Sequence, residues 1–195
     1  MKHLPFLLYL TGFILISIVR GYYTKRYTNI PKKITDKNAL DRILLFLTGV
    51  SMIIPFIYKF TDFLDFADYE LPLYMAVTGF LIFLFASWLL MKSHKDLGEA
   101  WSARPEINQK QKLITSGIYK KIRHPMYAAH ILWGIAQILL IQNWIAGFSL
   151  YITTLLLYLS RVNREERMLY EEFGEEYLNY LKNTGRILPF LKNHK

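Results

Sequence analysis

The sequence predicts an all-α, polytopic membrane protein: a helical bundle of about five transmembrane helices with a cytosolic connector and a C-terminal amphipathic helix. Hydrophobic residues make up 53% of the 195 residues although 20% are charged, so apolar and charged residues are segregated along the chain. Apolar segments long enough to cross a bilayer alternate with charged connections. The length suits a single domain, residues 1–195, rather than two domains.

Five apolar segments are the expected spans. At a rise of 1.5 Å per residue, each lies near the lower limit for crossing about 30 Å of hydrocarbon. Three of them fall in an N-terminal half, residues 1–91, and two follow a long connector in residues 92–195. The segments are residues 4–23, 39–60, 71–91, 125–141 and 144–160.

The first segment superficially resembles a secretory signal peptide. It lacks a small-residue cleavage site and ends in Arg20, so we expect an uncleaved first span. The fourth and fifth segments are joined only by Gln142 and Asn143. Together they are too long for one spanning helix, so this pair predicts a tight helical hairpin.

Basic residues alternate between the connections and so predict the orientation. Residues 20–42 contain seven Lys or Arg, residues 92–123 contain eight and residues 161–195 contain seven, which is 22 of the 24 in the chain. Residues 61–70 contain four acidic residues and no basic one. Positive connections stay on the cytosolic side of a membrane. The pattern therefore predicts an N-terminus outside and a C-terminus in the cytosol, and it explains the net charge of +9 without a nucleic-acid partner.

The two long cytosolic stretches differ in character. The last one, residues 161–182, repeats apolar residues at spacings of three and four, which predicts an amphipathic helix that continues the fifth span or lies along the membrane surface. We expect it to end before Gly185 and Pro189. The connector 92–123 is instead interrupted by residues that break helices, Gly98, Pro105 and Gly117.

Arg123-His124-Pro125 stands at the start of the fourth segment. Proline favours the first position of a helix, so His124 lies near the cap, where free N–H groups and Arg123 could receive a carboxylate or phosphate. Tyr119 and Tyr127 could place aromatic rings against a cation. The simpler alternative is that Arg123 and Tyr127 anchor the helix at the membrane interface while His124 only caps it.

A second polar group directly follows the fifth apolar segment. Arg161 and Glu165 are four residues apart and share a helix face, and Glu166 points well away from Arg161. A salt-bridged surface helix would explain this pattern. A functional site would require neighbouring elements to wrap around the helix. Ionisable residues at membrane depth are costly, which favours the functional interpretation.

Several classes of chemistry lack their signatures. The chain has no cysteine, which excludes disulfides, thiolate ligands and a cysteine nucleophile. Neither a dinucleotide fingerprint nor a phosphate-binding glycine loop is present. The five histidines show no paired ligand spacing, so we expect no metal.

Three stretches together resemble a known superfamily. They are L-x-T-S-G-I-Y-x-x-x-R-H-P-M-Y from Leu113, R-x-x-x-E-E-x-x-L from Arg161 and F-G-x-x-Y-x-x-Y from Phe173. This order resembles the isoprenylcysteine carboxyl methyltransferase and phospholipid methyltransferase superfamily of integral membrane enzymes. The resemblance extends over residues 97–189, about half of the chain.

The resemblance implies a membrane enzyme that uses S-adenosylmethionine from the cytosol and takes a lipidic or membrane-partitioned acceptor from the bilayer. It implies catalytic roles for Arg161 and Glu166, the first holding an anionic acceptor and the second orienting it or accepting a proton. It also implies a set of cofactor-binding residues: Leu113, Tyr119, Arg123, His124, Pro125, Tyr127 and Glu165.

Two other functions stay open from the sequence. Membrane sterol-type reductases resemble the same C-terminal region and use NADPH, and a non-catalytic membrane binding protein could keep the fold. The acceptor group is open as well, since a carboxylate, an amine or a thiol would each fit.

Overall fold

The computed structural model describes residues 3–27, 32–35, 38–102, 106–108 and 112–189. Pro105, one of the predicted helix breakers, lies outside these residues. The helices are α1 His3–Tyr27, α2 Ala39–Phe60, α3 Leu73–Leu97, α4 Pro125–Ile141, α5 Trp144–Phe173 and α6 Glu175–Asn183. The strands are β1 Lys32–Thr35 and β2 Glu106–Asn108, and short 3-10 helices cover Asp65–Ala67, Gly98–Ala100 and Gly117–Lys120.

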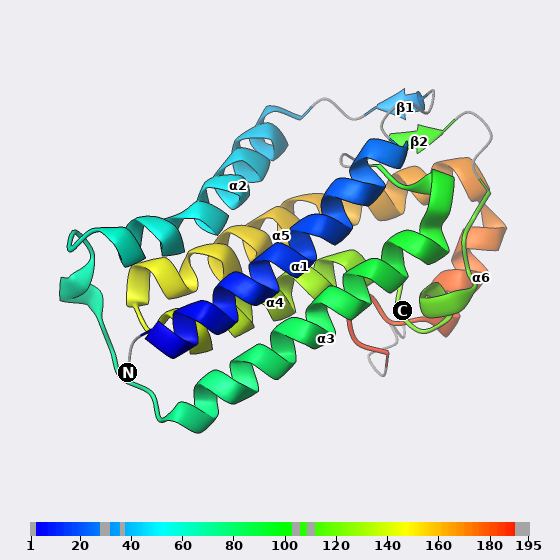
Figure 1. Ribbon diagram of the computed structural model, residues 1–195. Coiled ribbons are helices and arrows are strands. Elements are labelled where there is room, and N and C mark those ends of the chain that lie inside the picture. Colours follow the sequence, from blue (N-terminus) through cyan, green and yellow to red (C-terminus); the bar gives the residue numbers. More distant parts are fainter. Residues whose placement is uncertain (1–2, 28–31, 36–37, 103–105, 109–111, 190–195) are drawn as a thin grey trace.

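Five long helices run alternately up and down one bundle (Figure 1). Three of them, α3, α4 and α5, pack in that order, while α2 lies against α5 and α1 lies against α3 and α4. The end of α1, the start of α2, the end of α3 and the start of α4 therefore share one end of the bundle. We call this end the cavity end and the opposite end, which holds residues 61–72, the far end.

The predicted membrane bundle is confirmed. Within the described residues, four helices are long and apolar enough to cross a membrane, and α4 is a shorter apolar helix of 17 residues. Large apolar side chains stay exposed on the outer faces, for example Ile18, Phe46 and Leu81 at 63%, 70% and 60%. Lipid would cover such surfaces in a membrane protein.

The end of the third span differs from the expectation, whereas the fifth span continues into the amphipathic stretch, which was one of the two predicted arrangements. The third span was expected to end near residue 91, but α3 continues to Leu97. The fifth span continues without a break through Arg161 to Phe173, where Gly174 stops it with a φ of 53° and α6 begins. Only glycine adopts this conformation readily, so the amphipathic stretch is divided at Gly174 before it ends near Gly185.

A small β-ribbon lies at the cavity end, where the sequence predicted no strand. The backbones of β1 and β2 pair antiparallel, with Lys32 opposite Asn108 and Thr35 opposite Glu106. The ribbon joins the α1–α2 connection to the α3–α4 connector (Figure 1).

The predicted hairpin at Gln142-Asn143 closes the far end. Asn143 caps α5 by accepting from the backbone N–H groups of Ile145 and Ala146, and its amide donates to the Leu64 carbonyl at 2.7 Å. Its amide also donates to Asp68 at 3.0 Å. The buried polar atoms of Asn143 are therefore all bonded, as a buried amide requires.

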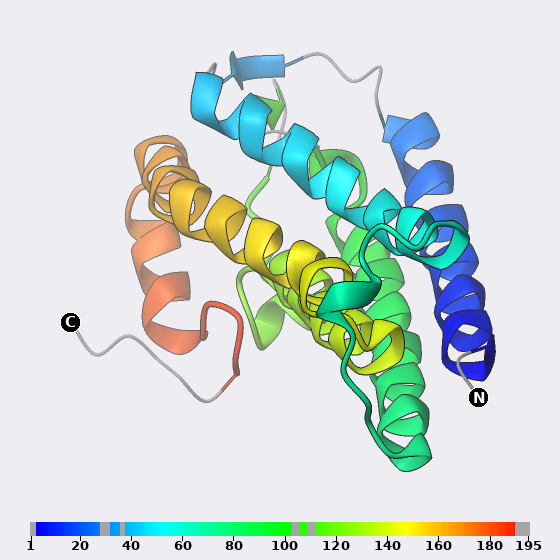
Figure 2. The same ribbon diagram turned by 90° about the vertical axis from the view of Figure 1, so that its left-hand side faces the viewer.

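Helices α1 and α2 touch at the far end and separate towards the cavity end (Figure 2). At the far end the ring of Phe56 packs edge-on against Phe6 and Phe13, with centroids 5.9 and 5.1 Å away. The Tyr9 hydroxyl also donates to Gln137 at 3.0 Å inside the bundle. The aromatic cluster thus holds the two helices together only over their far halves.

Candidate functional site

A cavity of about 440 Å³ occupies the cavity end. Side chains from all six helices and from the connector line it. Its size lies in the ordinary range for a small-molecule site. Eight of the nine residues expected from the sequence line this cavity: Leu113, Tyr119, Arg123, His124, Pro125, Tyr127, Arg161 and Glu165.

The start of α4 is held by backbone pairing with the C-terminal segment. The N–H of Arg123 donates to the Gly185 carbonyl and that of His124 to the Arg186 carbonyl, both at 2.8 Å. Pro125 occupies the start of α4, as expected, and the His124 side chain makes no cap hydrogen bond. The imidazole is therefore free to face α5 instead of its own helix.

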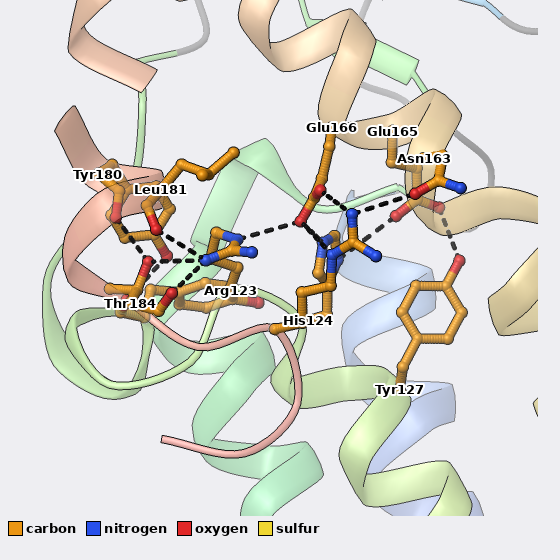
Figure 3. A network of polar contacts seen from close by, with 11 residues as sticks. Arg123, His124, Tyr127, Asn163, Glu165, Glu166, Tyr180, Leu181 and Thr184 are labelled. Atoms are coloured by element: carbon orange, nitrogen blue, oxygen red, sulfur yellow. Dashed lines mark hydrogen bonds and ion pairs between the residues drawn. The ribbon is translucent and has the colours of Figure 1, made fainter. Parts of the chain in front are cut away.

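His124 lies between the two consecutive glutamates of α5. Its Nδ1 is 3.7 Å from Glu165 and its Nε2 is 3.3 Å from Glu166. Glu165 also accepts a hydrogen bond of 2.6 Å from the Tyr127 hydroxyl (Figure 3). The parts of α4 and α5 at the cavity end thus converge on one set of polar contacts.

Glu166 is the ninth expected residue, and it does not belong to the residues that line the cavity. Its carboxylate is buried and pairs with Arg123 Nε at 3.0 Å, with His124 and with Arg186 Nη2 at 2.7 Å. Arg123 also donates to the carbonyls of Leu181 and Thr184 at the end of α6 (Figure 3). Glu166 therefore joins α4, α5 and the C-terminal segment behind the cavity wall.

Arg161 lines the cavity and is held by a residue that sequence reasoning missed. Asp41, in the first turn of α2 and only 4% exposed, lies 3.2 Å from Arg161 Nε and 2.6 Å from Arg164 Nη2. Ser160 also donates to Asp41. The sequence could have indicated Asp41, because a carboxylate at the start of a strongly apolar segment needs a partner. Nothing in the sequence indicated which partner.

Tyr119 is positioned by a tight turn in the connector. Gly117 has a φ of 62°, and a Cβ there would lie 2.1 Å from Asp96 Oδ2, the atom that accepts the N–H of Ile118 at 2.7 Å. Burial raises the pKa of the Tyr119 phenol well above its usual range. The phenol therefore stays protonated and presents a neutral ring and hydroxyl to the cavity.

Some buried polar groups in the cavity wall have no hydrogen-bond partner in the part of the chain that the structure describes. They include Arg123 Nη2, the Tyr177 hydroxyl and both ring nitrogens of His94. Burying such groups unpaired costs about 1–3 kcal/mol each. The wall therefore offers donors that a bound polar molecule would satisfy. Across the described ranges, no three His, Asp or Glu side chains gather as metal ligands would.

The nine site residues expected from the sequence all lie inside a segment that matches a known family. Residues 77–171 match the model of the isoprenylcysteine carboxyl methyltransferase family. The protein-S-isoprenylcysteine O-methyltransferase of Homo sapiens is 33% identical over 124 residues, which are 63% of this chain and 44% of the human protein. That of Xenopus laevis is 29% identical over the same length, 43% of its own chain. This chain thus covers less than half of these relatives.

A solved structure supports the fold. It is that of a eukaryotic intramembrane Ras methyltransferase, an isoprenylcysteine carboxyl methyltransferase. The two structures superpose with a TM-score of 0.58 and 20% identity, over 97% of this chain and 64% of the other. The helical bundle, including the two N-terminal helices that carry no motif, is therefore a shared membrane fold.

Proposed function

We propose that this chain belongs to the isoprenylcysteine carboxyl methyltransferase family, whose model residues 77–171 match, and that it is an S-adenosylmethionine-dependent membrane methyltransferase. We propose a lipidic acceptor of the isoprenoid type, in keeping with the names of the relatives. The observation that carries the proposal is the single cavity that polar residues of α4 and α5 and apolar residues of α2 line together.

The polar part of the cavity fits the methyl donor. When bound, S-adenosylmethionine supplies a methyl group on a sulfonium. Arg123 Nη2 and the Tyr177 hydroxyl are buried donors suited to a carboxylate. Tyr119 and Tyr127 offer ring faces to a cation, and Glu165 offers acceptor oxygens to ribose hydroxyls or an ammonium. Leu113, His124 and Pro125 complete this part of the wall.

The apolar part of the cavity fits an acceptor that arrives from the bilayer. Leu45, Gly49 and Met52 of α2 and Arg20 of α1 line the cavity together. The cavity lies at the end of the bundle where α1 and α2 have separated (Figure 2). A hydrocarbon chain would lie against these apolar residues, and its head group would reach the polar part. Positioning of two reactants in line accounts for much of the rate in a transfer of this kind.

Arg161 and Glu166 have different parts in this proposal. Arg161 lines the cavity, and its pairing with Asp41 fixes the guanidinium so that it can hold an anionic acceptor group. Glu166 was expected to act at the reacting groups. Its contacts favour a role through Arg123 and His124, whose other sides line the cavity.

We further propose that the cavity end faces the cytosol, with the N-terminus outside and the C-terminus inside. The basic connections gather at the cavity end, and the acidic residues 62–70 lie at the far end. This arrangement follows the positive-inside rule, and it lets a water-soluble cofactor reach Arg123 and Tyr177.

Calorimetric titration of the detergent-solubilised protein with S-adenosylhomocysteine tests the proposal. We expect one site with a dissociation constant below about 1 mM, since a cavity of this size with several hydrogen-bond donors in its wall gives affinities in this range or better. NADPH serves as the comparison ligand. Binding of NADPH together with no binding of S-adenosylhomocysteine would favour the reductase alternative instead.

A further inference from the structure

The connection between α2 and α3 at the far end forms a turn with three distinct faces. It contains the 3-10 helix Asp65–Ala67, and the N–H groups of Asp65, Ala67 and Asp68 each donate to the carbonyl three residues earlier. In this geometry, residues three apart project from the same side of the backbone. Residues 62 and 65, 63 and 66, and 64 and 67 therefore form three separate faces. We call residues 62–67 the far-end turn.

Two of the three faces match their surroundings. Leu64 and Ala67 are buried, and Leu64 belongs to the hydrophobic core of the bundle. Asp62 and Asp65 are exposed, as carboxylates in contact with water should be. One face of the far-end turn thus packs on protein and another faces solvent.

The third face is apolar and exposed. Phe63 and Phe66 are 78% and 79% exposed, although aromatic side chains of this size gain much from leaving water. Two neighbouring exposed aromatic rings form an apolar patch, and such a patch indicates that another apolar surface covers it.

The outward direction of the two rings is fixed by the attachment of the turn. The Asn143 amide donates to the Leu64 carbonyl at 2.7 Å and to Asp68 at 3.0 Å. The Tyr69 hydroxyl donates to the Ile138 carbonyl, at the end of α4, at 2.6 Å. The turn is therefore bound to the α4–α5 hairpin. These bonds also satisfy polar groups within the protein, which is required where a backbone approaches lipid.

The helix ends that adjoin the far-end turn are apolar and exposed as well. Phe60 ends α2, Leu73 and Tyr74 begin α3 and Trp144 begins α5, and all four side chains are more than half exposed. The Trp144 ring lies 4.9 Å from that of Tyr69. Tyrosine and tryptophan gather where spans leave a membrane. The far-end turn therefore lies at the level of the membrane surface.

We propose that Phe63 and Phe66 insert into the membrane at the far end, at the boundary between head groups and hydrocarbon, while Asp62 and Asp65 face the water. The partner is a lipid surface without net negative charge. Residues 61–70 contain four acidic residues and no basic one, so anionic head groups would repel this segment. In the orientation proposed above, this surface is the outer leaflet. The inference does not depend on methyl transfer.

The absence of cysteine from the chain makes the test direct, because single cysteines of the full protein can be labelled with bimane. The labelled positions are Phe63→Cys and Phe66→Cys, and the matched controls are Asp62→Cys and Asp65→Cys on the same turn. The proteins are placed in nanodiscs of phosphatidylcholine. A lipid with a nitroxide near the top of its acyl chain should quench the Phe positions at least about two-fold more than the controls, because interfacial apolar side chains lie about 5–10 Å deep. Iodide in the water should show the opposite order.

Two outcomes would overturn the insertion. Equal iodide quenching at all four positions would place the whole turn in water. Protection of Phe63→Cys and Phe66→Cys from both quenchers would mean that protein, such as a second copy of the chain, covers this face. In nanodiscs of phosphatidylglycerol, nitroxide quenching at the Phe positions should fall, and unchanged quenching would contradict the preference for a surface without negative charge.

Thermal unfolding identifies any variant that does not fold. Should one of the two Phe variants be lost, the other decides, because both positions belong to the same face. Failure of the proposed function has a different signature. A wild-type protein that does not bind S-adenosylhomocysteine would contradict that function and leave the expected order of quenching unchanged.

Discussion

The far end and the cavity end of the bundle differ in whether their buried polar groups have hydrogen-bond partners. At the far end, Asn143 is fully buried and each of its side-chain polar atoms has a partner. At the cavity end, ion pairs hold Glu166 and Asp41, while Arg123, Tyr177 and His94 keep unpartnered buried atoms. A satisfied network stabilises a fold, and an incomplete one leaves groups for a ligand. The difference separates the part that holds the bundle together from the part that binds.

The largest effect is expected for Glu166→Gln. Removing this charge leaves Arg123 and Arg186 without their carboxylate, which should cost about 3–5 kcal/mol of stability because a buried pair is broken. Affinity for S-adenosylhomocysteine should fall in parallel. Thermal unfolding in detergent and calorimetry measure the two quantities, and Glu171→Gln on the exposed face of α5 is the control. Unchanged stability with abolished methyl transfer would instead place Glu166 at the reacting groups.

Asp41→Asn should slow methyl transfer without preventing cofactor binding. Loss of a charge-assisted contact to Arg161 would lower the rate about ten- to a hundred-fold. Affinity for S-adenosylhomocysteine should stay nearly constant, and Asp41→Glu should restore part of the rate. Steady-state kinetics that separate kcat from KM provide the measurement. An equal loss of rate and cofactor affinity would mean that Asp41 only supports the fold.

His124→Ala should weaken cofactor affinity about ten-fold and lower the folded yield less, because the imidazole bridges Glu165 and Glu166 at the cavity wall. Size-exclusion yield and calorimetric titration give the two quantities. Parallel losses would identify His124 as a structural residue.

Asn143→Ala tests whether the far end of the bundle contributes to stability and not to binding. Loss of the α5 cap and of two donors should lower stability by about 1–2 kcal/mol. Affinity for S-adenosylhomocysteine should not change, since the far end does not contact the cavity. A weakened affinity would show that the two ends are coupled.

The smallest effect is expected for Asp62→Asn combined with Asp65→Asn. Both side chains belong to the far end, which we place outside the cell, so activity should stay within about two-fold. Lost activity would contradict the proposed orientation.

The spans and the convergence of α4 and α5 could be predicted from the sequence, because hydropathy sets the helices and a two-residue hairpin makes them antiparallel. The partners within the site could not. Asp41 lies 120 residues before Arg161, and only the packing of α2 on α5 brings them together. The position of Glu166 depends on Arg186 in a segment without a predicted element. Arg20 and His94 lie in the C-terminal parts of α1 and α3, and their environment depends on the packing of these two helices.

Helix α5 is continuous and lines both the apolar part and the polar part of the cavity, so the relative positions of the two parts depend on this helix. Thr154 and Leu157 line it within the membrane portion, and Leu169 lines it beyond Arg161, all on one helix. At 1.5 Å per residue, the stretch from Thr154 to Leu169 measures about 22 Å. One inserted residue between Leu157 and Arg161 would rotate everything downstream by about 100°. Substitutions at Thr154 and Leu157 could thus change the length of the acceptor's hydrocarbon chain that fits the cavity. An insertion or deletion in α5 would instead shift the residues that contact the head group relative to those that contact the chain.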